Sequence, residues 1–203
     1  RNDKIDCWLK GGADCPAREG ENQLHALFPA DPCVAVHPSD LASALLAFDA
    51  ELTVRGQGGE RRVALGDFFA LPTDERRTET VLRPDELIVS VHLPAPDAAM
   101  RSVYLKSMDR NVWAFALVGV ALAMRIDGQR IADARVVMSG VAPIPWRGPA
   151  AEQLLTGRSL GDVNADQVAE AALADAQPLR HNGYKIPLAK ALIRQAVADV
   201  TAK

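Results

Sequence analysis

The three cysteines are the side chains in this sequence best suited to bind a metal. Cys7, Cys15 and Cys33 all fall within the first 33 of 203 residues, with gaps of seven and seventeen residues between them. An odd number of cysteines in a chain of this length does not make a disulfide framework. The clustering indicates a local role, with metal ligation the first candidate. Incidental thiols in a surface loop remain the alternative, because three cysteines complete no common zinc or iron–sulfur pattern.

The segment that carries these cysteines, residues 1–32, is predicted to be irregular. Its glycines and prolines break any helical or strand period; they are Gly11, Gly12, Pro16, Gly20, Pro29 and Pro32. Such a loop can fold back and bring distant sulfurs together, which a regular helix or strand could not do at these spacings. The segment starts without Met inside a polar stretch, so we expect the natural protein to begin further upstream.

Elsewhere the residues point to no catalyst. The sequence has no Gly-rich phosphate loop followed by Lys and Ser or Thr, no HExxH and no Gly-x-Ser-x-Gly. The four histidines are scattered, and His92, in a predicted strand, is more simply a structural or surface residue. By themselves, the residues therefore say little about catalysis.

The elements of the first half are short. Residues 33–36 are a β-prone run, and Pro38 with Ser39 or Asp40 predicts the start of a helix over residues 40–48. Residues 52–55 and 62–65 are predicted to form a β-hairpin around a Gly-rich turn, and residues 87–93 another strand.

The second half reads as strands followed by helices. Residues 102–106 predict a strand, and the Asp127-Gly128 turn favours a hairpin between the apolar run 114–126 and residues 131–138. Helices are predicted over residues 148–155, 165–176 and 187–200. This order predicts an α+β fold with mainly antiparallel sheets.

Composition narrows the class of partner. Apolar residues make up 48%, charged residues 24%, and the net charge is −3, which argues against a nucleic-acid partner because that requires a clustered basic surface. The longest apolar stretch, residues 112–124, falls short of the roughly 20 residues of a membrane span. We expect no membrane partner. Reduced cysteines fit the cytoplasm, although a signal on a partner subunit could direct a prefolded complex to the periplasm.

Five stretches in order resemble the FAD-binding medium subunits of the molybdenum hydroxylases, the superfamily of xanthine dehydrogenase, aldehyde oxidoreductase and CO dehydrogenase. They are Cys7-x7-Cys15 with the Arg18–Ala26 stretch, His37–Leu41 with Ala44–Asp49, Pro84–Ile88, Tyr104–Lys106, and Gly140–Pro143 with Pro145–Arg147. The first is similar to an insertion that carries a [4Fe–4S] cluster in one subgroup. The resemblance covers essentially the whole chain.

The resemblance implies part of a flavin-binding α+β domain over residues 1–95 and a C-terminal domain of antiparallel strands and a helical bundle over residues 96–203. It also implies a division of labour. A large molybdopterin subunit would hydroxylate an aldehyde or a purine-like heterocycle, and a small subunit would pass the electrons through [2Fe–2S] clusters to FAD here, then to an external acceptor. Because the cofactor carries the redox chemistry, the resemblance implies no general acid, base or nucleophile in this chain.

By the same resemblance, Ser39 and Asp40 would contact the flavin tail, Leu87 would pack on the flavin ring, and Lys106 would place a positive charge near the ring or ribityl chain. The simpler roles are a helix cap for Ser39 and Asp40, strand core for Leu87 and a surface lysine for Lys106. Cys7, Cys15 and Cys33 would be cluster ligands, and Cys33 could instead be plain core.

One departure from the family pattern stands out. The Gly-rich loop that wraps the FAD pyrophosphate in these subunits has no counterpart here, and the family's cluster segment has one more cysteine before the equivalent of Arg1. We therefore expect a truncated chain, with the fourth thiolate upstream. Two other functions stay open: a non-catalytic module that docks the other subunits, and another FAD-dependent reductase of the same fold.

Overall fold

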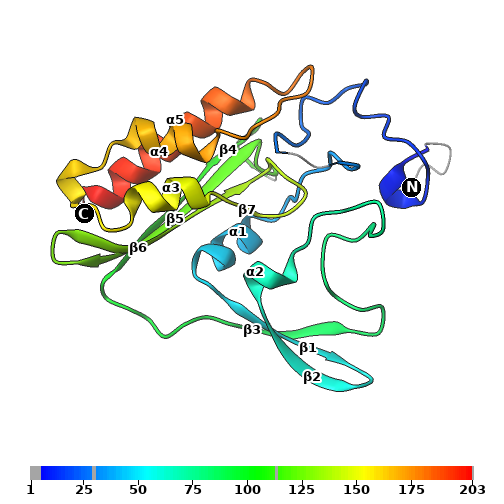
Figure 1. Cartoon of the computed structure of the whole chain (residues 1–203), viewed down its shortest axis with the longest axis horizontal. Coiled ribbons are helices and arrows are strands. Elements are labelled where there is room, and N and C mark those ends of the chain that lie inside the picture. The colour runs from blue at the N-terminus through cyan, green and yellow to red at the C-terminus, as the bar shows by residue number, and fades with distance from the viewer. Residues whose placement is uncertain (1–5, 29–30, 113, 203) are drawn as a thin grey trace.

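The computed structural model describes residues 6–28, 31–112 and 114–202, and it contains two antiparallel sheets (Figure 1). The first sheet has the order β2-β1-β3, with β1 Glu51–Gly56, β2 Gly59–Ala64 and β3 Leu87–His92. The predicted hairpin is confirmed: β1 and β2 pair from Glu51 with Ala64 to Gly56 with Gly59.

The second sheet has the order β4-β5-β6-β7. Its strands are β4 Met100–Ser107, β5 Val118–Asp127, β6 Arg130–Ser139 and β7 Trp146–Arg147. The run over residues 114–126, which could have been helix or strand, is therefore mostly strand, and it pairs with β6 through the Asp127-Gly128 turn. The short β7 was not predicted, because two residues are too few to show a period.

Helices cover the second sheet on both faces. On one face lie α3 Pro149–Leu155, α4 Ala165–Ala172 and α5 Lys185–Thr201, and on the other lies α1 Asp40–Ala47 (Figure 1). Alternate residues of a strand point to opposite faces, and β5 shows this: Val120 and Leu122 pack under α3 to α5, whereas Ala121 and Ala123 pack under α1. Because both faces are covered, β5 is apolar almost throughout and lacks the alternation of a half-exposed strand.

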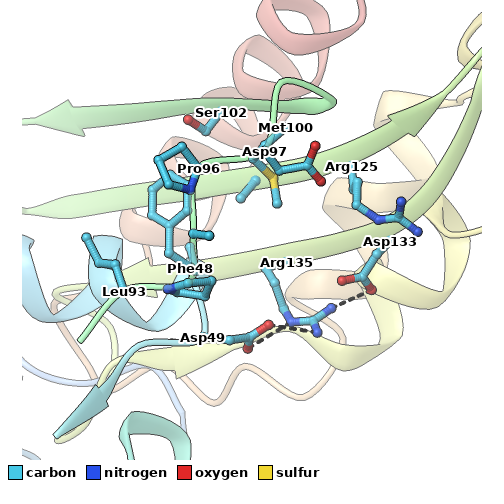
Figure 2. Close-up of a pocket in the computed structure, with 14 residues that line it drawn as sticks. Phe48, Asp49, Leu93, Pro96, Asp97, Met100, Ser102, Arg125, Asp133 and Arg135 are labelled. Atoms are coloured by element: carbon cyan, nitrogen blue, oxygen red, sulfur yellow. Dashed lines mark hydrogen bonds and ion pairs between the residues drawn. The ribbon is translucent and has the colours of Figure 1, made fainter. Parts of the chain in front are cut away.

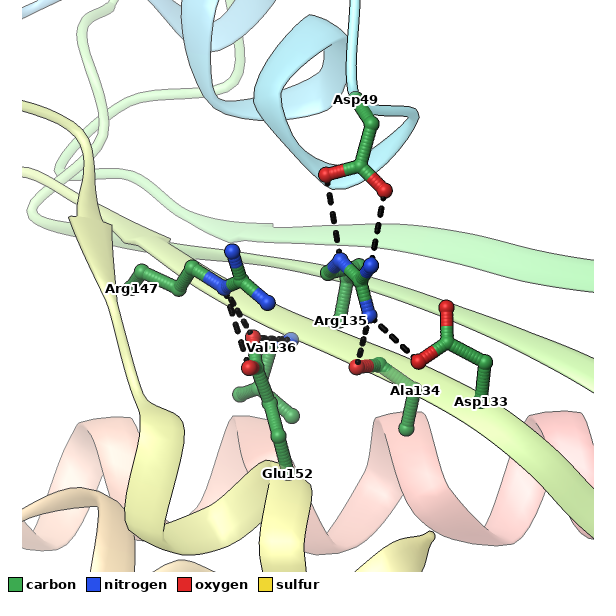
Figure 3. A network of polar contacts seen from close by, with 7 residues as sticks. All are labelled: Asp49, Asp133, Ala134, Arg135, Val136, Arg147 and Glu152. Carbon is green, nitrogen blue, oxygen red and sulfur yellow. Dashed lines mark hydrogen bonds and ion pairs between the residues drawn. The ribbon is translucent and has the colours of Figure 1, made fainter. Parts of the chain in front are cut away.

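A buried carboxylate fastens α3 to this sheet (Figure 3). Glu152 accepts hydrogen bonds from the Val136 backbone N–H at 3.0 Å and from Arg147 Nε at 2.8 Å. On the other face of β6, Arg135 pairs with Asp49 just after α1 at 2.9 Å and with Asp133 at 2.5 Å. Helix α3 and the turn after α1 are thus held to β6 by hydrogen bonds to charged groups, which are stronger than neutral ones.

Two predictions of local structure were wrong. Residues 33–36 are in no strand; the Ala26 N–H donates to the Val34 carbonyl and the His37 N–H to the Ala142 carbonyl. Cys33 and Val34 are buried although they are in no strand. Their apolar side chains resemble those of a strand, because a buried loop also requires apolar residues. The helix predicted over residues 165–176 ends at Ala172. The remaining elements, α2 Leu65–Phe68 and the short 3₁₀ turns Trp8–Lys10 and Leu160–Asp162, connect the larger ones.

Candidate functional site

The N-terminus of α1 presents a carboxylate toward the second sheet. Ser39 caps the helix, because its hydroxyl accepts the Ala42 backbone N–H at 3.1 Å, and this cap fixes Asp40 as the first helical residue. The Asp40 carboxylate accepts a hydrogen bond from Lys106 Nζ at 2.6 Å and another from the Tyr104 hydroxyl at 2.8 Å. The structure therefore brings together Ser39, Asp40 and Lys106, three of the four predicted flavin contacts.

Strand geometry explains why Tyr104 and Lys106 reach the same helix. They lie two residues apart on β4, so their side chains share a face of the sheet. The Tyr104 hydroxyl also lies 3.1 Å from Ser139 Oγ on β6. It can cross β5 because Gly119 lies between: a Cβ there would stand 2.5 Å from the Tyr104 oxygen and 2.3 Å from Ser139 Oγ.

The electrostatics keep Tyr104 a hydrogen-bond donor. Burial raises the pKa of its hydroxyl well above the ordinary value, and the Asp40 carboxylate adds to the rise. Lys106 and Asp40 are only partly buried, so each still has unused hydrogen-bonding capacity facing outward. A carboxylate and an ammonium side by side can bind a ligand rich in hydroxyls.

Sequence analysis missed Tyr104, Ser139 and Gly119 as members of this group. Gly119 carried a signal: an isolated glycine inside an apolar strand marks a close approach by another group. Tyr104 lies in one of the five stretches that resemble the family, but only its neighbour Lys106 was expected to contact the flavin. Ser139 carried no signal, because a single hydroxyl in a strand does not show what lies across from it.

Two adjoining cavities run along α1 away from this group. The smaller, of about 200 Å³, lies between α1 and the strands β4 and β5 and is lined in part by Ala44, Val103 and Tyr104. The larger, of about 410 Å³, lies at the other end of α1 (Figure 2). Phe48, Leu93 and Met100 give it an apolar lining, and Arg125 and Arg135 stand on its polar wall.

Leu87, the fourth predicted flavin contact, is the first residue of β3 and lies in the other sheet. Its side chain is 74% exposed, so the simpler role of strand core is wrong. The side chains of Ile88, Val89 and Val91 that follow it are also exposed. β3 thus presents an unusual run of apolar side chains to solvent.

The cysteines share one neighbourhood. Cys33 is buried, and burial raises the pKa of its thiol, although a hydrogen bond with the Ala35 backbone opposes the rise; electrostatic interactions with Cys15, Glu79 and Cys7 add to it. Cys7 and Cys15 are partly exposed. In the described part of the chain, however, no three Cys, His, Asp or Glu side chains stand close enough together to hold a metal ion.

The loop between α2 and β3 holds the Cys7 turn in place. Arg77 donates hydrogen bonds to the Trp8 carbonyl and, at 2.8 Å, to the Gly12 carbonyl, and its guanidinium lies 4.9 Å from the centre of the Trp8 ring. The turn itself needs Gly12, because a Cβ there would lie 2.6 Å from the Cys7 backbone nitrogen. The cysteine segment is irregular, as predicted, and its shape is set by specific contacts.

Family comparisons agree with this division of the fold. Residues 30–96 match the family described as "FAD binding domain in molybdopterin dehydrogenase", and residues 103–200 match "CO dehydrogenase flavoprotein C-terminal domain". The domain boundary between residues 95 and 96 stays a prediction.

Individual proteins similar to this chain come from the same family. The aldehyde oxidoreductase FAD-binding subunit PaoB of Escherichia coli K12 is 37% identical over 194 residues, which are 95% of this chain and 58% of that protein. The carbon monoxide dehydrogenase medium chain of Hydrogenophaga pseudoflava is 28% identical, over 79% of this chain and 56% of that one. A solved structure of carbon monoxide dehydrogenase from the same organism superimposes with a TM-score of 0.71 at 26% identity, covering 81% of this chain and 57% of the other.

The fold and these matches define the class: a flavin-binding α+β unit joined to an antiparallel C-terminal domain. The chain belongs to the FAD-binding medium subunits of the molybdenum hydroxylase family. It spans about three fifths of the length of the relatives it matches. In the ranges that the structure describes, no helix is both long and apolar enough to cross a bilayer.

Proposed function

We propose that the complete protein is the FAD-carrying electron-transfer subunit of an oxidoreductase complex. In this complex a large molybdopterin subunit oxidises the substrate, a small subunit passes the electrons through [2Fe–2S] clusters to FAD, and an external acceptor receives them. Of the proposed substrates, an aldehyde has more support than a purine-like heterocycle, because the relative at 37% identity is an aldehyde oxidoreductase subunit. We propose the cytoplasm as its compartment, with co-export to the periplasm as the alternative.

The group at the start of α1 is the observation that carries the flavin assignment. Asp40 and Lys106 pair at 2.6 Å with open hydrogen-bonding capacity on both, and this donor and acceptor set fits the hydroxyls of a ribityl chain. FAD, when bound, supplies the redox chemistry, and the protein supplies position and charge. Asp40 would accept a hydrogen bond from the flavin tail, with Ser39 fixing the helix start and Tyr104 orienting the carboxylate.

Lys106 would act through its charge. A positive charge near the flavin ring favours the anionic reduced form, and Leu87, exposed at the start of β3, would supply an apolar contact to the ring. The described residues hold no Gly-rich phosphate site, so the phosphate contacts would come from elsewhere in the full-length subunit.

Lys106→Met in the full-length subunit tests this role. We expect the flavin's reduction potential to fall while the free energy of unfolding changes by less than about 1 kcal/mol, since a partly exposed ion pair contributes little to stability. Lys190→Met is the matched control, because Lys190 pairs with Glu170 at 2.5 Å on the helical face, on the far side of the second sheet from α1. An unchanged potential in Lys106→Met would limit Lys106 to its ion pair with Asp40.

We further propose that Cys7, Cys15 and Cys33 are three of the four thiolates that bind a [4Fe–4S] cluster in the full-length subunit. Their shared neighbourhood supports this, and the glycines and prolines in the gaps between them suit a loop that folds around a cluster. A cluster also needs deprotonated thiols, and a bound metal would oppose the raised pKa of Cys33.

Iron and acid-labile sulfide analysis of the anaerobically purified full-length subunit tests the cluster. We expect about four irons per chain, lost together in Cys7→Ser or Cys15→Ser while the flavin absorbance is retained. Absence of iron, or zinc in its place, would contradict the assignment and leave these residues as incidental thiols.

A further inference from the structure

Lys185, at the start of α5, is a buried lysine whose charge has no acidic partner. Its side chain is 1% exposed, and no ion pair among the described residues includes it. The ammonium group donates to three backbone carbonyls instead: Leu24 at 2.8 Å, His25 at 3.1 Å and Gly140 at 2.8 Å. An ammonium has three donors, so each carbonyl receives one. Burying a lysine without a counter-charge lowers the free energy of unfolding, so packing alone does not explain why a lysine occupies this position.

The turn before α5 makes further bonds to the same N-terminal stretch. Asn182, fully buried, donates to the His25 carbonyl at 3.0 Å and the Ala26 carbonyl at 2.8 Å. Tyr184 donates its hydroxyl to the Gln23 carbonyl at 3.0 Å. Residues 23–26 have no regular secondary structure, so this turn supplies hydrogen bonds that a helix or sheet would otherwise provide.

The anchored stretch lies between two of the cysteines and is bonded to the chain beside each. Asn22, also fully buried, accepts the His181 N–H at 2.9 Å and donates to the Arg18 carbonyl at 2.9 Å, while the Arg18 N–H donates to the Cys15 carbonyl at 3.1 Å. On the other side, the Ala26 N–H donates to the Val34 carbonyl at 3.0 Å, next to Cys33. Short hydrogen-bonded paths therefore connect the α5 turn to Cys15 and to Cys33.

We propose that Lys185 is a positioning residue that fixes residues 22–26 on the C-terminal domain and thereby sets where Cys15 and Cys33 lie. The anchoring itself does not depend on what the cysteines bind; that it serves a cluster rests on the proposed function. A neutral side chain of similar length would remove this donor from the Leu24 and Gly140 carbonyls, whereas the His25 carbonyl would keep its bond from Asn182. Because α5 also packs through its own apolar face, this loss would open the N-terminal stretch and leave the C-terminal core closed.

Thiol protection in the metal-free full-length subunit tests the proposal. The protein is treated with iodoacetamide, and peptide mass spectrometry follows the alkylation of Cys33. In Lys185→Met we expect Cys33 to react at least about tenfold faster than in the unchanged protein, the size of effect that losing a buried hydrogen-bond donor produces. A reporter thiol at a buried position of α4, introduced by Ala169→Cys in both backgrounds, should keep its rate.

Two further variants complete the test. Lys190→Met makes the same chemical change one turn along α5, at a surface pair with Glu170, and should leave the Cys33 rate unchanged. If Lys185→Met does not fold, Tyr184→Phe tests the anchor instead. Tyr184 is partly exposed, and this substitution removes only its hydrogen bond to the Gln23 carbonyl. We expect Cys33 to react about two- to threefold faster in this variant.

An unchanged Cys33 rate would overturn the proposal. So would equal acceleration of Cys33 and the reporter thiol, because Lys185 would then contribute only to global stability. Iron content shows whether the anchor by Lys185 or the proposed [4Fe–4S] cluster has been refuted. A full-length subunit that never holds iron refutes the cluster and leaves the thiol result standing, whereas a cluster retained in Lys185→Met together with unchanged thiol protection refutes the anchor alone.

Discussion

The two sheets of this protein differ in how completely they bury their apolar side chains. β5, at the centre of the second sheet, is buried on both faces over most of its length. β3, at the edge of the first sheet, leaves Leu87, Val89 and Val91 exposed. The relatives are longer than this chain. The difference indicates that helices on both faces close the core around the second sheet, whereas the three-stranded sheet carries an apolar surface that only further contacts would cover.

The cysteine segment is a third case, since residues 6–28 and 31–33 contain no strand and no helix beyond one short turn. Its order comes from side chains that belong to other elements, Arg77 on one side and Lys185 with Asn182 on the other. Regions without a ladder of backbone hydrogen bonds depend on such contacts one by one. Single substitutions should therefore act locally in the cysteine segment and globally in the second sheet.

The largest contrast should come from matched leucine truncations in the two sheets. Leu122→Ala on β5 removes a fully buried side chain and should destabilise the chain by about 3 kcal/mol, from lost burial plus the cavity left behind. Leu87→Ala on β3 should change stability by less than about 0.5 kcal/mol. Urea unfolding followed by circular dichroism measures both. Similar losses in the two variants would show that β3 is covered in solution.

A smaller contrast is expected between two ion pairs. Glu152→Gln weakens a buried carboxylate that serves Arg147 and the Val136 N–H and should cost about 2 kcal/mol, as for other buried hydrogen bonds to charged groups. Glu51→Gln removes an exposed pair with Arg62 at 3.1 Å and should cost less than about 0.5 kcal/mol. Thermal unfolding of both variants tests the difference, and equal costs would contradict it.

The smallest effect concerns the pH dependence of Lys185. Burial lowers the pKa of its ammonium group from 10.5 to about 8, so the unfolded chain binds more protons than the folded one between these values. The free energy of unfolding should therefore rise with pH in this window, by about 1 to 2 kcal/mol, because the three carbonyl acceptors offset part of the burial penalty. Below pH 8 the penalty is fully present.

The measurement compares urea unfolding of the unchanged chain with that of Lys185→Met at pH 7.5 and pH 10. Cys33 acts in the opposite direction, since burial raises the pKa of its thiol, so both proteins carry Cys33→Ser in this comparison. His25 does not enter this window, because burial and Lys185 lower its pKa from 6.5. A difference that does not change with pH would show that the ammonium stays charged throughout.

Sequence patterns predicted most of the elements, because their signals are local. Ser39 marks the start of α1, and the Asp127-Gly128 turn marks the hairpin of β5 and β6. The patterns were wrong at residues 33–36, where burial under loops gave the apolar character of a strand. They also missed Gly119 as the gap that lets Tyr104 reach Ser139, since that role depends on two other strands.

By itself, then, the sequence determined the α+β class, the order of the elements and the family resemblance, all of which rest on residues near one another in the chain. Only the tertiary structure decided which distant groups meet. Asp40 and Lys106 are 66 residues apart, and Lys185 reaches the Leu24 carbonyl across 161 residues. Neither pairing leaves a periodic trace in the sequence. The physical reason is that a single polar side chain acquires its partner from the packing of whole elements, and that packing is set by apolar surfaces elsewhere.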